Sequence, residues 1–205
     1  MVDHVTIGDQ AKVAAGSGVT RDVKPGQVVG GRPAQWSHMM GVVTEYRRQL
    51  DLDSGLVRTR FRAGEVTHTR DVFASHPDQV IVMRISADRP GNVNFSVRPT
   101  SAHRSGFNAP FITRVGDDQL SLYGTVELGV IEFEARLLVR AEGGVVELGD
   151  TIATVTGADA ATLILAGATN FVSYNDVGGD PTARNDRTIE AIRGRSFDRL
   201  LRDHV

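Results

Sequence analysis

Apolar and polar residues alternate along most of residues 45–99. Val57, Thr59 and Phe61 fall on one face of a strand of period two, and the three arginines between and after them fall on the other. Turn-forming clusters of Gly, Pro, Asn, Asp and Ser separate the runs, at 53–55, 63–65, 76–78 and 89–92. This pattern predicts an antiparallel meander with one buried face.

The β pattern continues to about residue 171, beyond a polar stretch at 100–114 that we expect to be a long loop. Residues 131–139 alternate, so the odd-numbered positions are predicted to point inward and Glu132 and Glu134 to lie on the polar face. Residues 161–166 are apolar on both faces, which predicts a central strand. The predicted fold class is therefore mainly β, an antiparallel β-sandwich.

Only the last part of the chain has helical spacing. Asp180 is the expected N-cap of a first helix, with Pro181 at its first position and Ile189 and Ile192 on its apolar face. Gly194 is expected to end that helix. Ser196 is expected to cap a second helix that carries Phe197, Leu200 and Leu201.

Three motifs resemble a known enzyme family. They are YRRQLDLD at 46–53, TRDVFAS at 69–75 and DQVIV at 78–82. Their type, order and spacing resemble the N-terminal domain of the bacterial α-L-fucosidases of glycoside hydrolase family 95. The resemblance implies a supersandwich-like, incomplete β-sandwich at 42–175 and the start of a helical linker at 176–205.

In that family, terminal α-L-fucose is hydrolysed by inversion in a helical (α/α) barrel that holds the catalytic carboxylates. The resemblance therefore implies a non-catalytic domain whose partners are that barrel and, through the intact enzyme, a fucosylated oligosaccharide. Because the motifs of the barrel are absent from these 205 residues, we expect the chain to be inactive alone, with no catalytic residue, no metal site and no cofactor.

The first 36 residues follow a different pattern. Small or aliphatic residues recur every six positions between 4 and 35, as in a parallel β-helix. Here the chain resembles the C-terminal end of the hexapeptide-repeat β-helix in UDP-3-O-acylglucosamine N-acyltransferase. The resemblance implies a left-handed β-helix remnant at 1–36, followed by a junction at 37–41 that fits neither family.

The composition limits the partners, metal sites and membrane segments that the chain can have. The formal net charge of −2 gives no electrostatic case for nucleic acid or an acidic membrane surface. The chain has no cysteine, which excludes disulfides and thiolate metal sites. No run approaches the roughly 20 apolar residues of a membrane span. No apolar signal-peptide core follows Met1, although members of the fucosidase family are often exported, so the compartment stays open.

Candidate chemistry is sparse. Asp51 and Asp53 form a close carboxylate pair on one strand face, but a solvated strand end explains them better. His68, His76 and His103 match no compact ligand spacing. The loop at 102–111 supplies the candidate substrate contacts, since loops on rigid β scaffolds often carry binding residues. These candidates are His103, Arg104, Phe107, Asn108 and Phe111.

Three alternatives to the fucosidase-domain interpretation remain open at this point. The chain could be a fragment of a hexapeptide-repeat acyltransferase, defined by its first 36 residues. It could be a stand-alone carbohydrate-binding module. It could also be a non-functional chimeric or truncated product, joined between residues 36 and 41.

Overall fold

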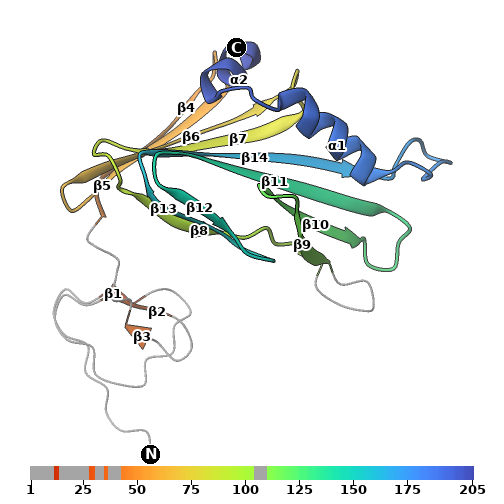
Figure 1. Cartoon of the computed structure of the whole chain (residues 1–205), viewed down its shortest axis with the longest axis horizontal. Coiled ribbons are helices and arrows are strands. Elements are labelled where there is room, and N and C mark those ends of the chain that lie inside the picture. The colour runs from red at the N-terminus through yellow and green to blue at the C-terminus, as the bar shows by residue number, and fades with distance from the viewer. Residues whose placement is uncertain (1–11, 14–27, 31–34, 37–42, 104–109) are drawn as a thin grey trace, which may run out of the picture. The chain divides into compact units, whose positions relative to one another are not determined.

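A computed structural model describes residues 12–13, 28–30, 35–36, 43–103 and 110–205 (Figure 1). The chain divides into two compact units, Met1–Val43 and Thr44–Val205. In the first unit, β1 (Lys12–Val13) pairs in parallel with β2 (Val28–Gly30), which pairs antiparallel with β3 (Gln35–Trp36). Most of the predicted β-helix remnant and the junction at 37–41 lie outside the described residues, so both stay predictions.

The second unit is built on a sheet of eight strands. Its order is β4-β5-β6-β7-β14-β11-β10-β9, and every neighbouring pair from β5 to β9 is antiparallel. The strands are β4 (Val43–Asp51), β5 (Leu56–Ala63), β6 (Val66–Ser75), β7 (Val80–Ala87), β9 (Phe111–Val115), β10 (Gln119–Thr125), β11 (Glu132–Glu142) and β14 (Ala160–Thr169).

A second, smaller sheet covers part of one face of the large sheet (Figure 1). It has the order β12-β13-β8, from β12 (Val145–Leu148), β13 (Ala153–Ala158) and β8 (Val93–Val97). Two helices cover the other face, α1 (Pro181–Ile192) and α2 (Phe197–His204). The mainly antiparallel β architecture confirms the predicted fold class.

The central strands of the large sheet are buried on both faces, so the unit has two cores, whereas the edge strand β4 is exposed along its length. Between the sheets, Leu137, Val139 and Leu163 pack against residues of β8 and β13. Between the large sheet and the helices, Leu138 and Ile164 pack against residues of α1 and α2. Successive residues of β14 therefore enter opposite cores, which confirms the prediction of a central strand at 161–166.

The C-terminal helices begin where the sequence predicts. Asp180 accepts a hydrogen bond from Ala183 N at 3.0 Å, and Ser196 accepts one from Arg199 N at 3.2 Å. Ile192 and Leu200 are completely buried against the large sheet. Both helices therefore form a third layer on the large sheet, and the assignment of 176–205 to the start of a linker stays a prediction.

Two local predictions were wrong. The loop expected at 100–114 ends earlier, because β9 begins at Phe111 and pairs with β10. The face of β11 that carries Glu134 was expected to be the polar face of a strand, yet Glu134 is only 3% exposed. The reason is tertiary: α1 lies over this face and makes the strand buried on both sides.

Candidate functional site

The most extensive polar cluster of the described residues lies between α1 and the large sheet. Glu134 on β11 accepts hydrogen bonds from Ser121 Oγ at 2.5 Å, from Asn185 Nδ2 at 3.0 Å and from Arg136 Nη2 at 2.8 Å. Ser121 lies on the neighbouring strand β10, and Asn185 is one of the buried residues of α1. The cluster thus joins two strands and a helix around one buried carboxylate.

Arg136 extends this cluster toward solvent. Its guanidinium also donates to Gln119 Oε1 at 3.2 Å and to Asp186 Oδ1 at 3.1 Å. It lines a pocket of about 540 Å³ beside α1, together with Asp118 and Glu190. Among the described residues, no buried side-chain nitrogen or oxygen lacks a hydrogen-bond partner. The hydrogen-bonding capacity of the buried polar groups in this cluster is therefore already used, as expected of a cluster that stabilises the fold.

The electrostatics of Glu134 favour its ionised form at neutral pH. Burial raises its pKa, but the hydrogen bonds from Ser121, Asn185 and Arg136 outweigh that effect and hold the pKa below its usual range. A general acid in glycoside hydrolysis needs a raised pKa instead. Glu134 therefore stays ionised and structural.

Tyr123 is fixed in its protonated form. Burial and a 2.8 Å hydrogen bond to Glu132 Oε2 raise the pKa of Tyr123 to about 12. Its ring lies 5.8 Å from that of Phe111, which is half-exposed on the edge strand β9. Tyr123 is therefore a neutral hydrogen-bond donor at physiological pH and not a nucleophile.

A second polar cluster fastens the turn between α1 and α2. Arg195 Nη1 donates to the buried carboxylate of Asp78 at 2.6 Å, and Ser75 Oγ donates to the same carboxylate at 2.6 Å. Arg140 donates to the carbonyl oxygen of Arg195 at 2.8 Å. In α2, the His204 ring stacks on Phe73 with centroids 4.8 Å apart. These contacts hold both helices in one position on the sheet.

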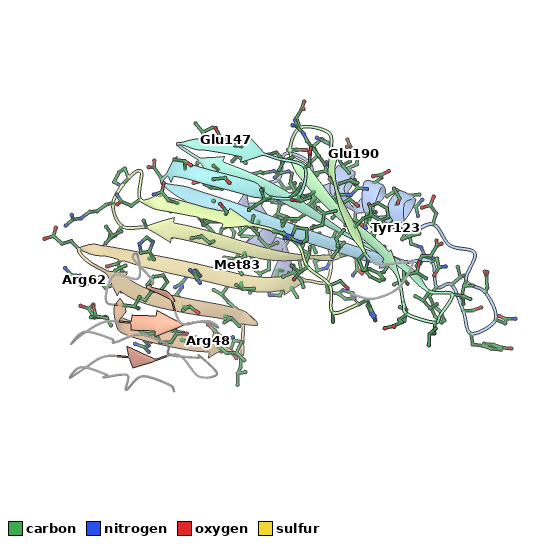
Figure 2. All side chains as sticks on the ribbon, turned by 90° about the horizontal axis from the view of Figure 1, so that it is seen from below. Arg48, Arg62, Met83, Tyr123, Glu147 and Glu190 are labelled. Atoms are coloured by element: carbon green, nitrogen blue, oxygen red, sulfur yellow. The ribbon has the colours of Figure 1, made fainter. Side chains whose placement is uncertain are left out.

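The opposite face of the large sheet carries an apolar pocket. It has about 300 Å³ and is lined mainly by aliphatic side chains, among them Met83, Leu122 and Leu165. Figure 2 looks onto this face, with the helices behind the sheet, and marks Met83 on β7. A more polar pocket of about 460 Å³ lies next to it and includes His103 and Leu122.

The two described candidate substrate contacts lie on opposite faces of the large sheet. The His103 ring lies 5.6 Å from Phe133, on the face that carries the small sheet. Phe111 pairs with Tyr123 on the face that carries α1. The other three candidates, Arg104, Phe107 and Asn108, lie outside the described residues. The structure therefore places the two described candidates apart, and their role stays a prediction.

Among the other candidate residues, Asp51 and His68 have local partners. Asp51 Oδ1 accepts hydrogen bonds from the backbone N of Asp53 at 3.0 Å and of Ser54 at 3.3 Å, so it stabilises the turn after β4. The His68 ring stacks on Phe61 at 5.2 Å. In the described part of the chain, no group of three or more His, Asp or Glu residues could hold a metal ion. No described helix is long and apolar enough to cross a membrane.

With the fold and these clusters in view, sequence comparison supplies the family. The sequence signature described as "Glycosyl hydrolase family 65, N-terminal domain" matches residues 20–174, which is more than half of the chain. The chain belongs to this family. The match spans both sheets of the second unit and begins within the segment predicted as a β-helix remnant.

Two curated relatives of this family 65-type domain are named as fucosidases. Alpha-L-fucosidase 2 of Arabidopsis thaliana is 33% identical over 192 residues, covering 82% of this chain and 23% of the relative. Probable alpha-fucosidase A of Aspergillus niger is 28% identical over 175 residues, covering 78% of this chain and 21% of the relative. The chain therefore spans less than a quarter of either relative.

A solved structure has the same fold. A putative kojibiose phosphorylase from human microbiome superimposes with a TM-score of 0.57 over 80% of this chain and 24% of its own, at 12% sequence identity. At this identity the likeness concerns the fold alone. The family 65-type N-terminal domain is thus a glycoside hydrolase domain with fucosidase relatives.

Proposed function

We propose that this chain is the non-catalytic N-terminal domain of an α-L-fucosidase-like glycoside hydrolase of family 95 and that it supports a helical catalytic barrel. The observation that carries the proposal is the 33% identity to Alpha-L-fucosidase 2 over 82% of this chain, combined with coverage of only 23% of that relative. A domain that is similar along its whole length to one part of an enzyme is expected to have the same function as that part.

The chemistry of the described carboxylates supports a non-catalytic role. Inverting glycosidases need one carboxylic acid and one carboxylate, about 6.5–9.5 Å apart, on either side of a sugar. Here Glu134 and Asp78 are bound by arginines, and Asp51 is bound in a turn. Carboxylates held in this way are already occupied by donors and offer no free carboxylic acid to protonate a leaving group.

In this proposal the fucosylated oligosaccharide binds to the intact enzyme and not to the domain alone. The experiment that tests it is incubation of the purified chain with p-nitrophenyl α-L-fucoside. No nitrophenolate above that of a mock preparation from cells that do not express the chain is expected, because contaminating fucosidase would be equal in both samples. A rate that is specific to the chain and scales with its concentration would overturn the non-catalytic assignment.

A binding measurement separates this proposal from a stand-alone carbohydrate-binding module. Fucosylated oligosaccharides titrated into the chain are expected to give no heat of binding at millimolar concentrations. Saturable binding by the isolated chain would favour the binding module instead.

A further inference from the structure

Two loops meet at one end of the large sheet. The first, residues 126–131, joins β10 to β11, and the second, residues 170–180, joins β14 to α1. β11 and β14 are antiparallel neighbours with Phe133 opposite Thr169. The end of the first loop and the start of the second loop therefore lie side by side at this end of the sheet. Figure 1 shows both loops at the end of the sheet next to the start of α1.

Asn170 fastens the two loops to each other. Its Nδ2 donates to the carbonyl oxygen of Val130 at 3.0 Å, and its Oδ1 accepts from Glu132 N at 3.0 Å. Its own backbone N donates to Glu132 O at 3.1 Å. Asn170 is only 5% exposed, so these hydrogen bonds are shielded from water and hold the loops in a fixed arrangement.

The second loop is also held along its length. Arg184 of α1 donates to the carbonyl oxygens of Thr169 at 2.7 Å and of Phe171 at 2.8 Å. Val172 N donates to Asp176 O at 3.0 Å, and the side chain of Asp176 accepts from Gly178 N at 2.7 Å. The loop is therefore ordered before anything binds to it.

These ordered loops turn large apolar side chains toward solvent. Leu128 is fully exposed, Tyr174 is 94% exposed, and three further apolar side chains are about half-exposed or more. We call the exposed apolar residues of these two loops the loop-end patch: Leu128, Val130, Phe171, Val172 and Tyr174. Ordered loops that display apolar side chains are typical of interaction surfaces, because ordering beforehand lowers the entropic cost of binding.

We propose that the loop-end patch is the surface on which the remaining part of a full-length fucosidase-like polypeptide docks. This inference rests on the proposed function. More than three quarters of each curated relative lies outside the region that this chain covers. Interfaces between domains of one chain typically bury 600–1,500 Å² and combine apolar with polar contacts.

The charges of the two loops define the chemistry of the partner surface. Residues 126–131 and 170–180 carry Glu127, Asp176 and Asp180 and contain no Lys, Arg or His. The basic side chain that contacts these loops, Arg184, is already bonded to the carbonyl oxygens of Thr169 and Phe171, so we expect the docking partner to be an apolar protein surface bordered by basic side chains.

An oligosaccharide fits this surface less well. Sugar binding requires polar groups that can reach the hydroxyls, in addition to an aromatic face. Three of the five patch residues are aliphatic, and the neighbouring polar groups are already bonded, Asn175 to Ser173 and Asp176 to Gly178. The patch offers area for apolar packing more than directional hydrogen bonds.

The test compares two triple variants of the full chain. The patch variant carries Leu128→Ser, Val172→Ser and Tyr174→Ser. The control variant carries Leu52→Ser, Val145→Ser and Ile152→Ser, which replace exposed apolar residues in the turn after β4, on β12 and in the turn before β13. Because all six side chains are exposed, both variants are expected to melt at the same temperature as the parent chain.

Each chain is then placed in the Arabidopsis Alpha-L-fucosidase 2 in exchange for its matching segment, and is also mixed with the separately expressed remainder of that enzyme. The patch variant is expected to weaken association in trans by about tenfold or more, to lower the melting temperature of the chimera and to reduce its fucosidase activity. The control variant is expected to behave like the parent.

Equal behaviour of patch and control variants, in a parent chimera that folds and hydrolyses fucosides, would overturn the docking surface and leave the proposed function intact. A parent chain that neither restores activity in the chimera nor associates in trans would overturn both. Binding of a fucosylated oligosaccharide to the isolated chain, lost in the patch variant alone, would overturn the docking surface in favour of a glycan site.

Discussion

Replacing the buried carboxylate of Glu134 by an amide tests the central cluster directly. Four donor atoms surround this carboxylate: Ser121 Oγ, Asn185 Nδ2, and Nε and Nη2 of Arg136. In Glu134→Gln the amide presents its own NH₂ group to some of these donors and leaves the guanidinium of Arg136, itself 3% exposed, without its closest counter-charge.

The size of the effect follows from that geometry. Breaking a buried ion pair by removing one partner typically costs about 3–5 kcal/mol. Asp186 still accepts from Arg136, and Gln keeps the shape of Glu, so we expect the lower part of that range, about 3 kcal/mol. Against a total stability of about 5–15 kcal/mol for a domain, this loss is large and easily measured.

The pH dependence gives a sharper criterion than the magnitude. The folded-state pKa of Glu134 lies below its value in the unfolded chain, so its contribution to stability is complete above the unfolded value of about 4.3. That contribution is lost as the pH falls through the folded pKa. The difference between parent and Glu134→Gln, from urea unfolding, should therefore be constant near neutral pH and shrink below about pH 4.3.

The surface carboxylate Glu190, which pairs with Arg193 at 2.8 Å, provides the matched control. Glu190→Gln should change stability little at any pH, because exposed ion pairs contribute little. A difference for Glu134→Gln as small as that of the control, or one that does not change with pH, would refute the assignment of Glu134 as a buried, ionised carboxylate.

Three further predictions concern the backbone and the helical layer. In thermal unfolding, Gly144→Ala should destabilise the second unit by more than about 2 kcal/mol, because φ of Gly144 is +63° and a Cβ there would overlap the backbone of β13. Gly64→Ala is the control: φ of Gly64 is +61° but its surroundings are open, so this variant should cost only about 1 kcal/mol. Arg195→Ala leaves the buried carboxylate of Asp78 with Ser75 as its remaining side-chain donor, and it should speed hydrogen exchange in α2 while exchange in β14 stays unchanged. Ile192→Ala should cost about 2–5 kcal/mol in urea unfolding, and a loss below 1 kcal/mol would show that α1 is a detached linker.

Local patterns predicted the elements well. The period-two runs located most strands, and the cap residues Asp180 and Ser196 fixed the starts of both helices, because these signals depend on backbone geometry within a few residues. The apolar run at 161–166 correctly predicted a strand in the middle of the sheet, because only a strand that is covered on both faces needs no polar face.

The tertiary structure alone decided which polar face is buried. Nothing near Glu134 in sequence distinguishes it from a solvated glutamate, because its partner Asn185 comes 51 residues later. The same holds for Asp78 and Arg195, which are 117 residues apart. The division of His103 and Phe111 between two faces likewise depends on how β9 joins the sheet edge. Periodicity determines which residues share a strand face, whereas the element that covers that face is set by long-range packing.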